Sequence, residues 1–177
     1  MEAKVNTWKA NLTNGLILGL IGIAYNMILY FLDLTFNQTM GYLMLLIQIV
    51  VLFLLVKSYR DNYMHGYITY GQAIGAGVII FLYSAIIMAL FTYVLYAIID
   101  PGLTAKKLAS LEEIMLKKGT PQASIDVFMK MEEKIQKPAI AAPLSILGSV
   151  LVGTIMSLII GIFVRKEGNP LIDSPEN

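Results

Sequence analysis

Residues 57–77 read KSYRDNYMHGYITYGQAIGAG and are richer in polar residues and glycine than any other stretch of the chain. They include the sole histidine, His65, and the consecutive polar residues Arg60, Asp61 and Asn62. Long apolar runs flank this stretch on both sides. We therefore predict that residues 57–77 form a cytoplasmic elbow between two membrane spans, and that the other segments are arranged around it.

The composition of the whole chain indicates a polytopic membrane protein. Of its 177 residues, 57% are hydrophobic and only 14% are charged, whereas soluble domains carry about 25% charged residues. The net charge of +1 and the lack of a basic run give no expectation of nucleic-acid binding. The chain has no cysteine, which excludes disulfides, thiolate catalysis and thiolate metal sites.

Four runs are apolar enough to cross a hydrocarbon core of about 30 Å, which takes about 20 helical residues. We place these spans at residues 12–32, 40–56, 72–99 and 139–164. The first is expected to be a retained span, because it is longer than the apolar region of a cleaved signal. Residues 1–177 are thus predicted to form a single all-α membrane domain, a four-helix bundle.

Residues 103–138 are too polar to span a bilayer and are expected to form an amphipathic hairpin of two helices. The first helix would present Leu108, Leu111 and Met115 on one face. The second would present Ile125, Phe128 and Ile135 on one side, with charged pairs outside. We therefore predict an extramembrane helical insert between the third and fourth spans.

Lysine and arginine in the short loops favour an orientation with both termini in the cytoplasm. The inner side then holds Lys4, Lys9, Lys57, Arg60, Arg165 and Lys166. The first outer loop contains neither Lys nor Arg. The lysines of residues 103–138 conflict with this orientation, but short loops decide it best, so we expect the hairpin to be extracytoplasmic.

Small residues recur every four positions along the fourth span and make one stripe on a helix. The stripe consists of Ser145, Ser149, Gly153, Ser157 and Gly161. Similar small positions are Gly15 and Gly19 in the first span, and Gly71, Gly75 and Gly77 where the third span begins. We predict close helix packing at these positions, either within one bundle or between two copies in a homodimer.

The candidate functional polar cluster of the elbow consists of Arg60, Asp61, His65, Tyr70 and Gln72. A metal site needs several His, Asp or Glu ligands, and only Asp61 lies near the sole histidine. We therefore expect a solvated or interfacial His65, and we expect no metal or cofactor. The tyrosines at positions 59, 63, 67 and 70 are predicted to form one aromatic face on a short interfacial helix.

Neither a P-loop nor a nucleophile elbow nor an H-E-x-x-H motif occurs, so we do not expect an enzyme. Our leading hypothesis is a non-enzymatic accessory or scaffold protein that packs in the lipid bilayer with itself or with a partner membrane protein. The alternative is a subunit of a small oligomeric transporter or channel, lined by the amides of Asn14, Asn26, Gln48 and Gln72. A third hypothesis, a membrane-embedded enzyme, would use Asp61 and His65.

The elbow sequence, with Gly66 followed by Tyr70-Gly71-Gln72-Ala73, resembles an uncharacterised bacterial family of small four-span membrane proteins. This family is common in the Bacteroidetes and is known as a domain of unknown function. The order of segments is similar over nearly the whole chain, down to a basic ending at Arg165-Lys166. The resemblance implies a multi-pass protein of the bacterial inner membrane, and it supplies no activity, substrate or catalytic residue.

Overall fold

The computed structural model describes residues 6–167, apart from the side chains of residues 138 and 139. This part of the chain is helical, and its sole strand-like pairing is an isolated antiparallel bridge. The helices are α1 (Thr7–Phe31), α2 (Gln38–Tyr63), α3 (Tyr70–Val94), the π-helix η1 (Leu95–Ile99), α4 (Leu103–Lys117), α5 (Gln122–Ile135) and α6 (Pro138–Val164).

Four helical segments are long and apolar enough to cross a membrane, as expected of a small multi-pass membrane protein. They are α1, α2, the continuous segment Tyr70–Ile99 and residues Ile140–Val164 of α6. The predicted all-α fold with four candidate spans is therefore confirmed. The observed helices also extend beyond the predicted spans, most of all α2, which continues past residue 56 to Tyr63. The length of an apolar run indicates which residues can lie in the hydrocarbon core, whereas the helix itself can continue into water.

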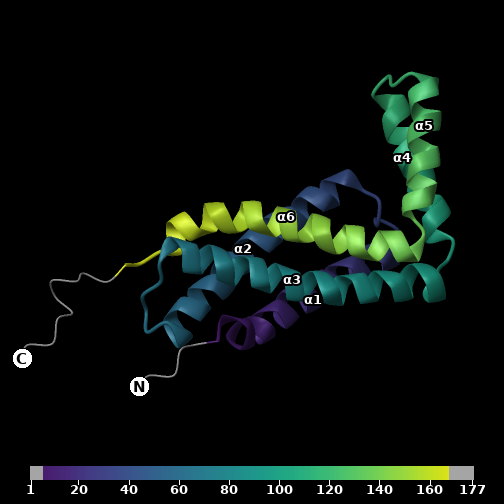
Figure 1. The fold of residues 1–177 in the computed structure, drawn as a ribbon. Helices are drawn as coiled ribbons and strands as arrows, with labels where there is room; N and C mark the ends of the chain where they lie inside the picture. Colours follow the sequence, from purple (N-terminus) through teal and green to yellow (C-terminus); the bar gives the residue numbers. More distant parts are fainter. Residues whose placement is uncertain (1–5, 168–177) are drawn as a thin grey trace, which may run out of the picture.

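Helix α3 is the centre of the bundle, with α1 and α6 packed against it (Figure 1). Helix α2 packs less extensively, against α1, α3 and α6. The beginnings of α1 and α3 and the ends of α2 and α6 lie at one end of the bundle, which we call the elbow end (Figure 1). Helices α4 and α5 lie at the opposite end, which we call the far end.

Polar side chains determine where three of the long helices begin. The Asn6 side chain accepts a hydrogen bond from the backbone N–H of Trp8, and Asn37 accepts one from that of Thr39, at 3.1 and 2.9 Å. Thr69 begins α3 with a capping box, in which the Gln72 side chain accepts from the Thr69 backbone N–H. These oxygens satisfy backbone N–H groups that have no partner inside the helix.

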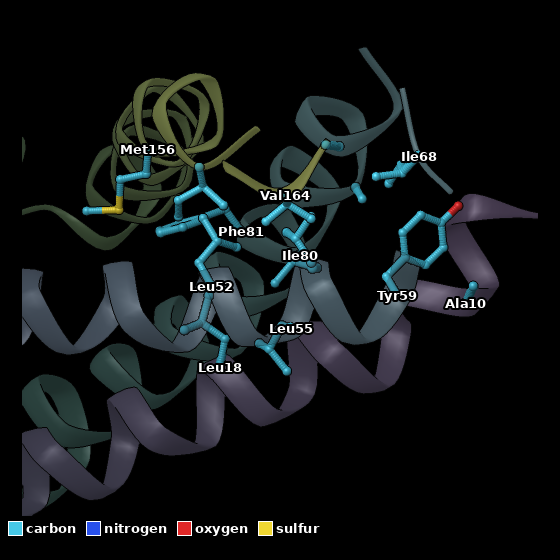
Figure 2. Packing of buried hydrophobic residues seen from close by; sticks show 14 residues of the cluster. Ala10, Leu18, Leu52, Leu55, Tyr59, Ile68, Ile80, Phe81, Met156 and Val164 are labelled. Carbon is cyan, nitrogen blue, oxygen red and sulfur yellow. The ribbon is translucent and has the colours of Figure 1, made fainter. Parts of the chain in front are cut away.

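The hydrophobic core is concentrated towards the elbow end, as the cluster in Figure 2 shows. It joins the first half of α1 and the second half of α2 to the first half of α3 and the second half of α6. Leu52, Ile80 and Val164 are at most 1% exposed there. The labelled members of the cluster are Ala10, Leu18, Leu52, Leu55, Tyr59, Ile68, Ile80, Phe81, Met156 and Val164.

Close backbone approach joins α6 to α3 in this half of the bundle. A Cβ atom added to Gly153 would overlap the ring of Phe81, and one added to Gly77 would overlap the side chain of Ser157. Helix association in lipid depends on van der Waals packing, which small residues permit by letting two backbones come close. The glycines of α3 and α6 therefore set the distance between these two helices.

Helices α4 and α5 form a segment that we call the arm, residues 103–135. Figure 1 shows the two helices side by side, directed away from the far end and crosswise to α6. Leu103 and Ile125 are buried in the arm, and Lys107 Nζ donates to Glu132 Oε1 across it at 2.9 Å. On the outer surface, the Lys117 ammonium donates a hydrogen bond to the Glu113 carboxylate one helical turn away, and this bond lowers the pKa of the Glu113 carboxyl.

Candidate functional site

The elbow consists of the end of α2, a turn at residues 64–69 and the beginning of α3. Residues 57–63 complete α2, and Met64 ends that helix. His65 and Gly66 follow with φ values of 51° and 82°, in the left-handed region that glycine adopts readily and a β-carbon disfavours. His65 is exposed at this turn. The reversal of the chain therefore depends on two consecutive left-handed residues, and the sole histidine is one of them.

Arg60 joins the end of α2 to the end of α6. Its Nε donates to Asp61 Oδ1 at 2.7 Å, and its Nη1 donates to the backbone carbonyl of Val164 at 3.1 Å. The last carbonyls of a helix have no partner within that helix, and the guanidinium satisfies one of them. Its positive charge also interacts favourably with the negative end of the helix dipole. Arg60 and Asp61 thus act together to hold α6 against α2.

The residues that follow α6 pair with the elbow. Ile68 and Lys166 exchange two backbone hydrogen bonds, at 2.9 and 3.0 Å. The Lys166 ammonium lies 5.2 Å from the centre of the Tyr67 ring, within the range of a cation–π contact. The short bridge therefore connects the basic ending of the fourth span to the turn before α3.

The elbow tyrosines do not share one helix, so the prediction of a short interfacial helix carrying all four is wrong. Tyr59 and Tyr63 stack on the last turns of α2, with ring centres 5.9 Å apart. Tyr67 lies in the turn, and Tyr70 begins α3. The left-handed backbone at His65 explains the difference, because it ends the helix between the two pairs.

Two of these tyrosines make hydrogen bonds to other helices. The hydroxyl of Tyr70 donates to the carbonyl of Leu158 on α6 at 3.0 Å. Tyr59 is only 2% exposed, and its hydroxyl donates to Thr7 Oγ1 on α1 at 3.3 Å. Arg60, Ile68 and Tyr70 contact α6 or the residues just after it, and together with Lys166, which pairs with Ile68, they are hereafter the latch.

A buried amide pair in α1 lies near the latch and was not predicted from the sequence. Asn11 is 0% exposed; its Nδ2 donates to the Thr7 carbonyl and its Oδ1 accepts from Asn14 Nδ2, each at 3.0 Å. Asn14 is also buried. The spacing of Thr7, Asn11 and Asn14 places them on one face of a helix, which was the available signal. It was missed because the predicted span began at residue 12.

The four amides proposed to line a pathway do not come together in one chain. Asn14 bonds to Asn11, Asn26 Nδ2 donates to the Gly22 carbonyl of its own helix, and Gln72 caps α3. Asn14 and Asn26 lie about 18 Å apart along the axis of α1. Gln48 is half-buried on α2. Three of the four amides therefore have partners inside the helix to which they belong.

The predicted packing positions fall into two groups. Added β-carbons at Gly15, Gly19, Gly77, Gly153 and Gly161 would contact the side chains Tyr83, Ile87, Ser157, Phe81 and Tyr70, respectively. Ser157 is buried, whereas Ser145 is exposed and Ser149 is half-buried. Gly71 and Gly75 have no described atom within 4 Å of an added β-carbon, so they do not bring helices together.

The elbow groups are placed for holding helices more than for chemistry. The Asp61 carboxylate is engaged by Arg60, and Tyr70 and Gln72 have partners of their own. Within residues 6–167, the structure brings no three His, Asp or Glu side chains close enough to hold a metal ion. Each member of the predicted polar cluster except His65 thus contributes a side-chain hydrogen bond to the ends of the helices.

One of the three comparisons with known proteins found a match. Neither a curated protein nor a solved structure matches the chain. A family model described as "Protein of unknown function (DUF4199)" matches residues 13–166. The matched region runs from within α1 to the basic residues after α6, and it includes the elbow, the arm, most of the first candidate span and all of the other three. The chain therefore belongs to the DUF4199 family of proteins of unknown function.

Proposed function

We propose that this chain is a non-enzymatic accessory or scaffold protein of the bacterial inner membrane, and that it binds a partner membrane protein through its arm. The observation that carries the proposal is a set of exposed apolar side chains outside the candidate spans. Val127 is 70% exposed, Leu116 52% and Met131 50%. Outside lipid, apolar side chains exposed together mark interaction surfaces.

The packing inside the bundle supports a partner surface on the arm. The small positions Gly153, Ser157 and Gly161 already contact α3, so the part of the stripe that could pair two copies through α6 is engaged within one chain. The arm is different, because it extends away from the bundle, and its helices pack mainly against each other (Figure 1). Val127 and Met131 are one helical turn apart and therefore share a face of α5.

Charge supports the same surface. Lys130 and Lys134 are exposed on α5, at positions one helical turn apart beside the apolar pair. An apolar strip bordered by lysines would complement a partner with an apolar patch and an acidic rim, since complementary charge directs association. The arm thus combines an apolar surface for binding with lysines that would select a partner of complementary charge.

The proposed orientation places the elbow end in the cytoplasm and the arm outside it. Lys9, Lys57, Arg60, Arg165 and Lys166 belong to the elbow end, and positive residues in short loops favour the cytoplasmic side. An even number of spans puts both termini on the same side. A reporter fused after Asn177 is expected to be active in the cytoplasm, and activity only outside the cell would contradict this orientation.

Site-specific photo-crosslinking in native membranes tests the proposed function. A photoreactive side chain at position 127 is expected to give a discrete protein adduct, which mass spectrometry would identify as a partner or a second copy. The matched control is position 113, an exposed site on the other helix of the arm, where no such adduct is expected. Equal adducts from both positions, or adducts with lipid alone, would overturn the proposal.

A further inference from the structure

A cavity of 440 Å³ lies at the far end, where the end of α3 and η1 meet α4, α5 and α6. Its lining includes small apolar residues, among them Ala97, Ala141 and Ala142. It also includes the polar residues Tyr96, Lys107 and Gln136. Binding sites for small molecules commonly have about 300–1,000 Å³ and this mixture of apolar walls and few polar groups.

The cavity continues the small-residue stripe of α6. Towards the elbow end, α3 fills the stripe, because Phe81 packs on Gly153 and Tyr70 packs on Gly161. Towards the far end, the same stripe reaches Ser145, which lines the cavity. Side chains of α3 thus fill the stripe in one half, whereas in the other half a cavity lies beside it. A cavity lined by small and apolar residues can take a hydrocarbon chain.

The π-helix η1 contributes to the opening. It replaces the last turns of the third span at Leu95–Ile99, and both Tyr96 and Ala97 belong to it. A π-helical turn is wider than an α-helical turn, and such turns occur frequently at functional sites. The geometry of the third span therefore changes at the same residues that face the cavity.

The polar side of the cavity is held in place by a half-buried ion pair. Glu132 Oε1 accepts from Lys107 Nζ at 2.9 Å and from Gln136 Nε2 at 2.8 Å. The Glu132 side chain is only 14% exposed, and its carboxylate restrains the position of the ammonium. A lysine ammonium has three N–H donors, and the structure uses one of them for Glu132. The others can serve an oxygen acceptor inside the cavity.

We propose that this cavity binds a single-chain phosphate amphiphile, with its hydrocarbon chain along the small apolar residues and its phosphate oxygens at Lys107 and Tyr96. The cavity lies where an apolar span meets the polar arm, which corresponds to the depth of lipid headgroups. The ligand chemistry is a phosphate ester joined to one acyl chain, whether it comes from the bilayer or from a soluble pool. This site does not depend on the proposed partner surface of the arm.

The test is native mass spectrometry of the full chain released from phosphatidylcholine nanodiscs that contain lysophosphatidylglycerol. The wild-type chain is expected to retain one lysophosphatidylglycerol. Lys107→Met should retain about tenfold less, because a charge-assisted hydrogen bond is lost. Lys106→Met is the matched control, since Lys106 is the adjacent lysine and does not line the cavity. This control should retain the lysolipid as the wild type does.

A second variant separates loss of binding from loss of folding. Ala97→Phe fills the cavity from an exposed position and leaves the Lys107–Glu132 pair unchanged, so it should abolish retention while the thermal unfolding temperature is preserved. Monoolein has an acyl chain without a phosphate, and glycerol phosphate has a phosphate without an acyl chain. Neither should be retained as well as the lysolipid. The proposal is overturned by equal retention in Lys107→Met and Lys106→Met, by retention in Ala97→Phe, by equal retention of monoolein, or by no retention in the wild type. Binding of glycerol phosphate as tight as that of the lysolipid would show a simple phosphate site and would also overturn it.

Discussion

The two ends of the bundle differ in how they use polar residues. At the elbow end, Arg60 and Tyr70 donate to backbone carbonyls of α6, next to the hydrophobic core. At the far end, Lys107 and Gln136 line a cavity of 440 Å³. The elbow, which is the stretch richest in polar residues and glycine, therefore joins helices. The open polar surface lies among residues that attract little attention in the sequence.

The largest expected difference between the ends concerns glycines of α6. Gly153→Ala places a β-carbon against the ring of the buried Phe81, and overpacking of this kind costs about 1–3 kcal/mol of unfolding free energy. Gly148→Ala is the matched control towards the far end, because nothing lies within 4 Å of its added β-carbon. It should be neutral or stabilising by up to about 1 kcal/mol. Denaturant unfolding in mild detergent measures the free energy of unfolding of both variants. Equal destabilisation would contradict the predicted difference between the two ends.

The second comparison uses two asparagines of α1. Asn11→Leu removes the acceptor of Asn14 in a fully buried position, and an unpaired buried amide costs about 1–3 kcal/mol. Asn26→Leu, towards the far end, removes only a bond to the carbonyl of Gly22 in the same helix from a half-buried position. We expect a loss of less than about 1 kcal/mol there. Denaturant titrations of the two variants would contradict the account if Asn26→Leu were the more damaging.

The third comparison concerns two cations. Arg60→Met removes the bonds to Asp61 and to the Val164 carbonyl and should cost about 1.5 kcal/mol. Lys106→Met removes an exposed contact of 4.0 Å with Asp100 at the far end and should cost at most about 0.5 kcal/mol. Thermal unfolding at low and high salt measures both. A loss for Lys106→Met that matches that of Arg60→Met would show that the latch is not special.

The smallest expected effect concerns two left-handed turns. His65→Gly at the elbow relieves a positive φ and should stabilise the chain by about 0.5 kcal/mol, after the entropy cost of glycine is subtracted. Gly119→Ala in the turn of the arm, at φ 72°, should destabilise it by about 1 kcal/mol. Differential scanning calorimetry would test both signs. Destabilisation by His65→Gly would mean that the imidazole makes a needed contact.

The overall fold could be predicted from the sequence because apolar run length determines which segments can span a bilayer. The four candidate spans followed from this argument alone. Composition could not show that α2 continues to Tyr63, since a helix can extend beyond the bilayer with charged residues on its surface. It also could not show that the left-handed backbone at His65 separates the elbow tyrosines into two pairs.

The candidate site was harder to predict, because the role of each residue depends on its contacts with other helices. The role of Arg60 depends on its hydrogen bond to the carbonyl of Val164, at 3.1 Å, and the sequence does not show that these distant segments lie side by side. Gly71 and Gly153 have the same side chain, yet only Gly153 has a neighbouring helix against it. The cavity could not be predicted for the same reason, since it is lined by residues of five helical elements.

The central claim is that the elbow joins helices, while the far end carries the binding surface. One measurement tests it directly: quantitative mass spectrometry of proteins crosslinked to the full chain in native membranes, for two double variants. Asp61→Ala with His65→Ala alters the elbow, and Val127→Glu with Met131→Glu alters the arm. We predict that the elbow variant keeps the wild-type adducts and that the arm variant loses them. Adducts lost from the elbow variant and kept by the arm variant would contradict the account.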